Sequence, residues 1–161
     1  MKVKTTKYVL NRLKQKPLEL TVLIAFFPLW LIVSIIIRIL SPFKIIRTGP
    51  IHTHGFGNFL CFIEYYLSEK TLGMHPENTI DIFYPYTHIS SHYLMKMAKR
   101  KMLITKLAFY IDKVNRLFPD RKKYQLHYPS LVMDAKGILT KTKPHLSFTD
   151  EEIKRGQVFM N

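Results

Sequence analysis

The order of short apolar runs along residues 43–118 limits the fold of this chain more than any other feature. Two runs are short and rich in β-branched and aromatic residues, whereas three others repeat their apolar residues at helical spacing. They are a strand at 43–47, a helix at 58–70, a strand at 79–84, a helix from Ser90 or Ser91 to about Met102, and a helix at 107–118. Strands that alternate with helices across short connections predict an α/β fold with a parallel sheet.

Two details of this prediction are less sharp. Residues 124–139 lack a clear period and predict one or two further strands, with a turn at Lys136-Gly137. Asp81, between two isoleucines of the second strand, is expected on the less buried face of the sheet.

The connection at residues 48–57 is the strongest candidate for a binding site. It is rich in glycine, and ligands of open α/β sheets bind beyond the carboxyl ends of the strands. Free N–H groups at the start of the next helix suit a phosphate or a sugar hydroxyl, which makes Gly55, Gly57 and Asn58 candidates for substrate binding. The dinucleotide fingerprint is not met, because Leu60 stands where its third glycine would fall. A tight turn with glycines at positive φ explains the same residues.

Two histidines, His52 and His54, flank Thr53 in this connection. Alternate histidines can share a metal ion, but a zinc site needs a third and usually a fourth ligand at a recognisable spacing, and none follows. The sequence therefore predicts no metal, and a loop histidine that contacts substrate is the better interpretation. Glu64 in the following helix either points back to this connection or faces solvent.

Residues 20–37 form a run of eighteen residues without a charge. As a helix this run would extend roughly 27 Å, close to the thickness of the hydrocarbon core of a bilayer. We therefore expect a membrane-associated hydrophobic helix over 18–40 after a basic flank over 1–17. A cleaved signal peptide is the rival interpretation, but the run is long for one and residues 41–44 lack a small-x-small cleavage site.

Both flanks of this segment are basic, and Pro28 lies near its middle. One arrangement is an ordinary kinked span, since proline is common in membrane helices. The other is a segment that bends at Phe27-Pro28 and returns, or lies at the interface, which keeps both flanks on one side. The second arrangement places the main domain on the cytoplasmic face of the cytoplasmic membrane, and this is the predicted localisation.

The chain has a net charge of +14 at pH 7, of which residues 1–40 carry +6. Such an excess attracts phosphate in lipid, in a sugar nucleotide or in nucleic acid. The main domain holds one basic cluster around Lys96, Lys99 and Arg100 and a second at residues 121–123. Because the chain also contains a membrane segment, anionic membrane lipid is the predicted partner of Lys96, Lys99 and Arg100, and nucleic acid is less favoured.

A helix-start signal lies close to the last residue of the sequence. Thr149 is a good N-cap, and Glu152 three residues later completes a capping box. Asp150 and Glu151 add negative charge where the helix dipole is positive. Such a signal normally opens a helix that leads into more structure, so residues 144–161 are expected to be a linker and the start of a truncated helix.

These motifs together resemble the N-terminal part of a bacterial glycosyltransferase family associated with surface-polysaccharide synthesis. The match covers most of residues 43–156, and its last motif is the most specific. The motifs are Ile45-Ile46-Arg47 before the His54-Gly55 loop, Glu64-x-Tyr66-Leu67, Ile80-Asp81-Ile82-Phe83-Tyr84, Leu94-x-Lys96-Met97, Asn115-Arg116-Leu117, and Pro144-His145-Leu146-Ser147-Phe148-Thr149-x-Glu151-Glu152 with Arg155-Gly156. The loop departs from the Arg-Ile-Gly-His run that is typical of the family.

The resemblance implies a two-domain enzyme of the GT-B type that needs no metal, and no cofactor is expected. Residues 41–143 would form an incomplete, Rossmann-like half-domain on the acceptor side, and an absent second domain would hold most of the nucleotide-sugar contacts. The enzyme would transfer a sugar from a nucleotide-sugar to a polysaccharide or lipid-linked acceptor. His54 would be the catalytic base, and the substrate-binding residues would be Gly55, Gly57, Asn58, Glu64 and His145.

Two other functions fit the residues without the resemblance. One is a non-catalytic, membrane-anchored interaction module, and the other is a basic nucleic-acid-binding protein.

Overall fold

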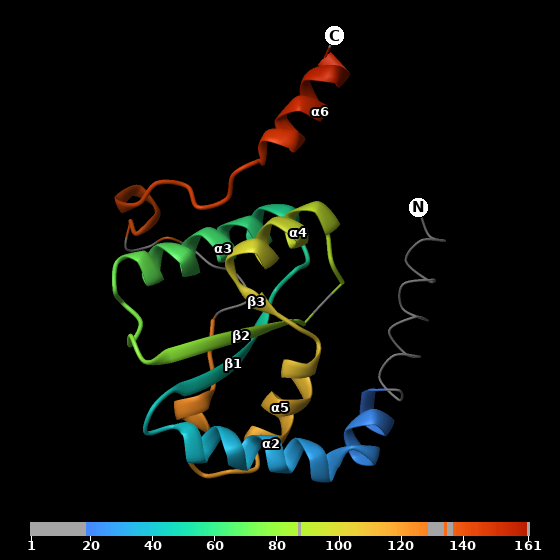
Figure 1. The fold of residues 1–161 in the computed structure, drawn as a ribbon, viewed down its shortest axis with the longest axis vertical. Coiled ribbons are helices and arrows are strands. Elements are labelled where there is room, and N and C mark those ends of the chain that lie inside the picture. Colours follow the sequence, from blue (N-terminus) through green and yellow to red (C-terminus); the bar gives the residue numbers. More distant parts are fainter. Residues whose placement is uncertain (1–18, 87, 129–133, 135–136, 161) are drawn as a thin grey trace.

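The computed structural model describes residues 19–86, 88–128, 134 and 137–160. Within them, a three-stranded parallel sheet lies between two pairs of helices: α3 and α4 cover one face, and α2 and α5 cover the other (Figure 1). The predicted α/β fold with a parallel sheet is therefore confirmed. The elements are α2 (Phe27–Leu40), β1 (Ile45–Ile51), α3 (Phe56–Thr71), β2 (Thr79–Pro85), α4 (His92–Lys101), β3 (Leu103–Ile104), α5 (Leu107–Asn115), the 3-10 turns η1 (Arg121–Tyr124) and η2 (Leu139–Lys141), and α6 (Asp150–Met160).

β1 is longer than the predicted strand. It continues through Gly49 and Pro50, which the sequence assigned to the connection. β1 lies at the edge of the sheet in the order β1-β2-β3, and a proline is tolerated in an edge strand. The Leu126 N–H donates to the Thr48 carbonyl at 2.8 Å. Gly49 leaves room for this approach, because a Cβ at position 49 would collide with Leu126. The end of a strand can therefore contain both residues that normally mark a loop.

The remaining differences lie at the ends of elements. α3 begins at Phe56, before the predicted start, and α5 ends at Asn115 rather than at residue 118. No pattern in the sequence predicts β3, a two-residue strand that pairs with Ile82 and Phe83. The described part of the 124–139 stretch holds an isolated bridge from Gln125 to Thr48 and no longer strand. Residues 129–133 and 135–136, and the predicted basic flank at 1–17, lie outside the described residues.

The main core lies between the sheet and the α3–α4 layer. Phe59, Phe62, Ile63 and Tyr66 of α3 are at most 2% exposed and recur at the helical spacing that the sequence showed. Phe83 of β2 packs edge-on against the rings of Phe62 and Tyr66. Burial of aromatic side chains such as these is the dominant favourable contribution to folding.

The hydrophobic segment is bent rather than straight. A short helix, Glu19–Ala25, meets α2 at an angle of 73°. The break falls at Phe26, and Pro28 lies in the first turn of α2, where a proline needs no hydrogen-bond acceptor. No single helix among the described residues has the length and apolarity for a membrane crossing, although the bent pair satisfies both measures when it is taken together.

The predicted helix start near Thr149 is confirmed. The Thr149 N–H donates to the Glu152 carboxylate at 2.9 Å, and the Glu152 N–H donates to Thr149 Oγ1 at 3.4 Å. These two bonds are the capping box that the sequence predicts. α6 then extends away from the sheet (Figure 1).

Candidate functional site

The loop between β1 and α3 lies at the carboxyl edge of the sheet, as predicted. Gly55 is the N-cap of α3 and has a φ of 76°, a left-handed conformation that favours glycine. Gly57 lies in the first turn of α3, where an added Cβ would meet no atom within 4 Å. Asn58 follows and is half-buried. The turn interpretation therefore explains Gly55 but not Gly57, and no side chain caps this helix end.

The two loop histidines have different surroundings. His54 is exposed, whereas His52 is half-buried and packs edge-on against Tyr86, with 5.5 Å between ring centroids. Burial, and then the charge of His54, lower the pKa of His52. Thr53 between them donates its hydroxyl to the His88 carbonyl at 3.0 Å, which ties the loop after β1 to the loop after β2. His54 is thus the loop imidazole that is more accessible to a ligand.

Glu64 and His145, both predicted to bind substrate, lie together although 81 residues separate them in the sequence. The Glu64 carboxylate accepts the backbone N–H of His145 at 2.9 Å and of Leu146 at 2.8 Å, and it lies 3.1 Å from His145 Nδ1. The other ring nitrogen of His145 lies 2.9 Å from Thr71 Oγ1. Glu64 therefore points neither to the glycine loop nor to open solvent. It fastens the segment 144–146 to α3.

The segment 144–146, held against α3 by Glu64, forms one wall of a groove, which we call the α3–α4 groove. The groove has a volume of about 450 Å³ and lies between α3, α4 and the segment 139–148. Its three aromatic lining residues are all exposed: Phe56 at 58%, Tyr93 at 43% and Phe148 at 61%. The lining residues are Phe56, Leu60, Glu64, Ser68, Tyr93, Leu94, Met97, Leu139, Thr142, Lys143, Pro144, Leu146 and Phe148.

The α3–α4 groove is mostly apolar and open to solvent along one side. Phe56 and Tyr93 lie in the first turns of α3 and α4, at the carboxyl edge of the sheet. Ser68 lies further along α3, and its hydroxyl oxygen is 2.6 Å from that of Thr142, which follows η2. The groove therefore runs along α3 and has one end next to the glycine loop. An elongated ligand with apolar faces would fit it.

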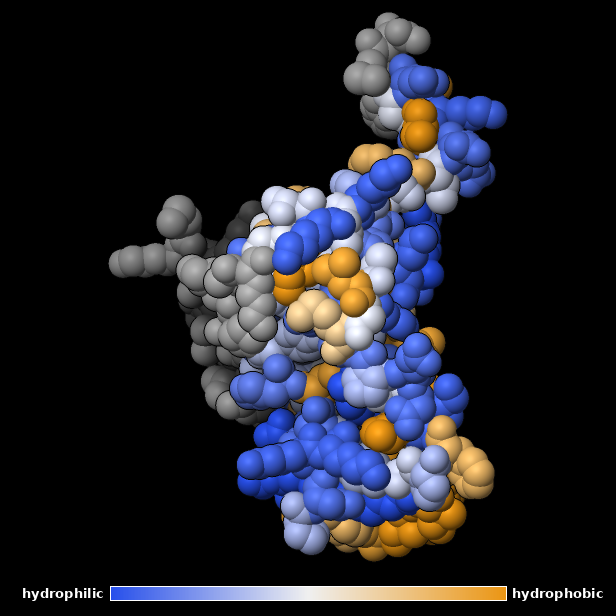
Figure 2. Space-filling model, turned by 90° about the vertical axis from the view of Figure 1, so that its left-hand side faces the viewer, coloured by the Kyte–Doolittle hydropathy of each residue, from blue (hydrophilic) through white to orange (hydrophobic). Residues whose placement is uncertain are grey.

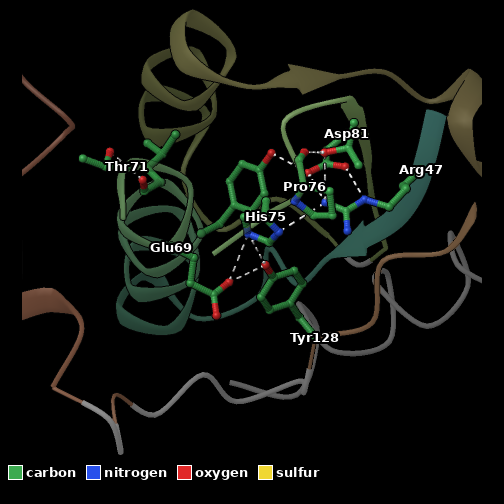
Figure 3. A network of polar contacts seen from close by, with 10 residues as sticks. Arg47, Glu69, Thr71, His75, Pro76, Asp81 and Tyr128 are labelled. Atoms are coloured by element: carbon green, nitrogen blue, oxygen red, sulfur yellow. Dashed lines mark hydrogen bonds and ion pairs between the residues drawn. The ribbon is translucent and has the colours of Figure 1, made fainter. Parts of the chain in front are cut away.

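A buried polar network lies under the other end of α3 (Figure 3). Arg47 and Asp81 stand opposite each other in the register of β1 and β2. The Arg47 guanidinium donates to both Asp81 oxygens, at 2.7 and 2.8 Å, and the Tyr66 hydroxyl donates to Asp81 at 2.9 Å. Asp81 is 9% exposed, so its predicted place on the less buried face is wrong. The sequence pattern failed because an arginine partner makes burial of this carboxylate possible.

The network continues through His75 to Glu69 and Tyr128. Arg47 lies 3.2 Å from His75 Nδ1, and the Tyr128 hydroxyl donates to Glu69 at 2.6 Å. Burial and then the hydrogen bond to Glu69 raise the pKa of Tyr128. Because its groups satisfy one another, this network has the character of a structural cluster rather than of an open site.

Two cations of the basic cluster on α4 pair with a carboxylate of α6. Arg100 donates to Glu152, and Lys96 lies 3.7 Å from the same carboxylate. The hydrogen bond from Arg100 is the largest cause that lowers the pKa of Glu152, to about 2. Lys99 is exposed. The cluster lies on the α3–α4 side of the sheet, opposite the hydrophobic helix α2 (Figure 1).

Among the described residues, no three histidine, cysteine, aspartate or glutamate side chains lie close enough together to hold a metal ion. At the carboxyl edge of the sheet, the exposed imidazole of His54 instead lies beside the start of α3, which no side chain caps, and beside one end of the α3–α4 groove. Sequence reasoning missed the groove, because Phe56, Tyr93 and Phe148 come from three separate segments. Their one shared signal is an aromatic residue within two positions of a helix N-cap, which is Gly55, Ser91 or Thr149.

The chain was compared with family models, with curated proteins and with solved structures, and none of them matches it. The glycosyltransferase resemblance therefore stays a prediction from the motifs.

The fastening by Glu64 leads to a stability prediction. We expect Glu64→Ala to lower the free energy of unfolding by about 2–3 kcal/mol, because two backbone N–H groups and one imidazole lose a charged acceptor. Hydrogen exchange should also accelerate at His145 and Leu146. Urea unfolding and exchange mass spectrometry measure both effects. Glu77→Ala, at an exposed position outside the groove, is the matched control and should change neither. Unchanged exchange at residues 145–146 in Glu64→Ala would contradict the fastening.

Proposed function

We propose that this chain is the acceptor-binding part of a membrane-associated glycosyltransferase, and that the α3–α4 groove holds the glycan of the acceptor. One observation carries the proposal: the exposed rings of Phe56, Tyr93 and Phe148 line an open apolar groove. Pyranose rings have apolar C–H faces that stack on aromatic rings, while their hydroxyl groups stay in water. An open groove with aromatic edges suits an extended saccharide better than a small enclosed ligand.

The motif resemblance supports the reaction class. Glu64 and His145 come from two of the quoted motifs: Glu64 lines the α3–α4 groove, and it accepts the backbone N–H of His145, whose neighbours Pro144 and Leu146 line the groove. In this proposal residues 41–143 are a Rossmann-like half-domain on the acceptor side of a GT-B enzyme. The nucleotide-sugar is held mainly by a second domain, and the sugar passes to a polysaccharide or to a lipid-linked glycan.

The position of the glycine loop supports a role for His54. Phe56 at one end of the groove follows His54 by two residues, so a glycan in the groove has its terminal sugar close to this imidazole. Imidazole is the commonest general base in proteins. His54 would take the proton of the acceptor hydroxyl while that oxygen attacks the anomeric carbon of the donor and the nucleotide leaves. Gly55, Gly57 and Asn58 would present backbone N–H groups to a phosphate or hydroxyl.

The proposed localisation is the cytoplasmic membrane, with the main domain facing the cytoplasm. The α3–α4 groove and the hydrophobic helix α2 lie on opposite sides of the sheet (Figure 1). A groove on the side away from α2 suits the water-soluble part of an acceptor. For this reason we assign the glycan, and not a lipid chain, to the groove.

A glycan array printed with bacterial surface oligosaccharides tests the proposal on the full chain. At least one oligosaccharide should bind, and Tyr93→Ala combined with Phe148→Ala should weaken its binding by about tenfold or more, since each stacked ring contributes roughly 0.5–1.5 kcal/mol. Phe43→Ala removes a ring that is 78% exposed on the α2 side, and it should leave binding unchanged. The proposal fails if no printed glycan binds, or if the two groove substitutions have no more effect than Phe43→Ala.

A further inference from the structure

One face of helix α2, the inner face, packs against the domain along most of the length of the helix. Trp30, Ser34 and Ile37 are buried at a spacing of four and three residues. The Trp30 ring stacks on Tyr110 of α5, with 5.1 Å between centroids and 12° between planes. Such contacts along the helix axis hold α2 parallel to the surface of the domain.

Arg38 secures the carboxyl-terminal half of α2. Its guanidinium donates to Asn115 at 2.8 Å and pairs with Asp120 at 2.9 Å, and it lies 3.6 Å above the Phe118 ring. α2 is thus anchored to the domain at both ends of its inner face. Its orientation relative to the sheet is fixed, so the direction in which its outer face points is fixed as well.

The outer face of α2 is apolar and exposed. Ile32, Ile36 and Ile39 are 54%, 46% and 67% exposed, and Phe43 just beyond the helix is 78% exposed. Among the described residues, eleven of the 22 exposed large apolar side chains lie between Leu20 and Phe43. Figure 2 shows this concentration as an orange band at the end of the molecule where α2 lies. A contiguous apolar band of this kind marks an interaction surface.

Cations lie next to this band. The exposed side chains of Lys44, Arg121, Lys122 and Lys123 gather near the carboxyl end of α2, where Lys123 Nζ lies 3.3 Å from Ser41 Oγ. The neighbouring acid, Asp120, is paired with Arg38. An apolar face with a basic edge is complementary to the acyl–headgroup boundary of an anionic bilayer.

We propose that α2 lies flat in the headgroup region of an anionic membrane, with Ile32, Ile36 and Ile39 in the acyl boundary and the residues around Lys44 and Lys122 on lipid phosphates. The proposal deepens the membrane association in the proposed function. It does not depend on the α3–α4 groove, so glycan binding and vesicle binding can fail separately. It also replaces Lys96, Lys99 and Arg100 as the membrane-binding cations, because a flat bilayer under α2 would lie on the other side of the sheet from α4.

Flotation of the full chain with lipid vesicles tests the apolar contact. Vesicles of phosphatidylcholine with about one-third phosphatidylglycerol should carry the protein to the top of a sucrose gradient. Ile32→Ser combined with Ile36→Ser should weaken this partition by roughly a hundredfold, at about tenfold for each partly inserted side chain. Leu72→Ser combined with Val158→Ser, two exposed positions away from α2, should leave it unchanged. Circular dichroism establishes that all variants are folded.

The same assay tests the basic edge. Lys44→Gln combined with Lys122→Gln should weaken partition by roughly 25-fold, at about fivefold for each cation near an anionic surface, and the loss should shrink on pure phosphatidylcholine. Lys99→Gln combined with Lys101→Gln removes the same charge from α4 and should change partition by less than about twofold. The proposal is overturned if the isoleucine variant floats like the parent chain, or if the α4 pair has the larger effect. Concentration-dependent dimers without vesicle binding would also overturn it, because a second copy would then cover α2.

Discussion

Replacement of Asp81 by alanine is expected to lower the free energy of unfolding by about 3–5 kcal/mol, the largest loss expected from a polar substitution in the described residues. The side chains of Arg47 and Asp81 are 15% and 4% exposed, so removal of the carboxylate leaves a guanidinium largely cut off from water. The Tyr66 hydroxyl loses its acceptor in the same step. Urea unfolding followed by circular dichroism measures the loss.

A double variant separates the cost of an unpaired charge from the value of the pair. Arg47→Met combined with Asp81→Leu removes both charges and keeps similar volumes, so it should be at least about 2 kcal/mol more stable than Asp81→Ala alone. The proposed cost of an unpaired Arg47 charge is wrong if Asp81→Ala lowers the free energy of unfolding by less than about 1 kcal/mol. It is also wrong if the double variant is no more stable than Asp81→Ala.

The second large effect is expected from Gly49→Ala. A Cβ at this position would lie 2.6 Å from Leu126 Cβ and 2.7 Å from the Leu126 carbonyl oxygen. The second contact is with backbone, so the segment around Leu126, which runs parallel to β1 at the Thr48–Gln125 bridge, must move and its hydrogen bond to Thr48 must weaken. We expect a loss of about 3 kcal/mol in the free energy of unfolding, at the upper end for an overpacked position.

Gly57→Ala is the matched control for this prediction. An added Cβ at Gly57 meets nothing within 4 Å, and its place in α3 favours alanine over glycine. Its thermal midpoint should equal or exceed that of the parent chain, whereas that of Gly49→Ala should fall by many degrees. Equal midpoints for the two variants would show that Leu126 does not limit the space at Gly49.

Local signals were enough to predict the order of β1, α3, β2, α4 and α5, but they did not reveal β3. Apolar residues at helical spacing located α3 through Phe59 and Phe62, and Ser91 caps α4 with a bond of 3.2 Å from the Leu94 N–H. The capping box at Thr149 depends on residues that are three apart, which a sequence shows directly. In each case the interaction lies within one turn of a helix.

Features that depend on distant partners could not be predicted in the same way. Asp81 is buried because Arg47 stands opposite it, and strand register is not visible in a single sequence. Glu64 binds a segment 81 residues away, so its direction depends on a chain path that no local pattern encodes. β1 retains Gly49 although glycine usually marks a loop, because Leu126 approaches it closely. The α3–α4 groove could not be predicted for the same reason, since its aromatic side chains are distant in the sequence and meet only after folding.

Hydrogen exchange of the full chain, with and without the oligosaccharide that binds best on the glycan array, tests the proposed acceptor site most directly. If the α3–α4 groove holds the glycan, the bound sugar should slow exchange in the segments 56–60, 93–97 and 144–148, each of which contributes lining residues. Residues 27–40 of α2, on the other side of the sheet, should exchange at the same rate in both samples. Slower exchange confined to α2, or unchanged exchange around the groove while the glycan is bound, would contradict the proposal.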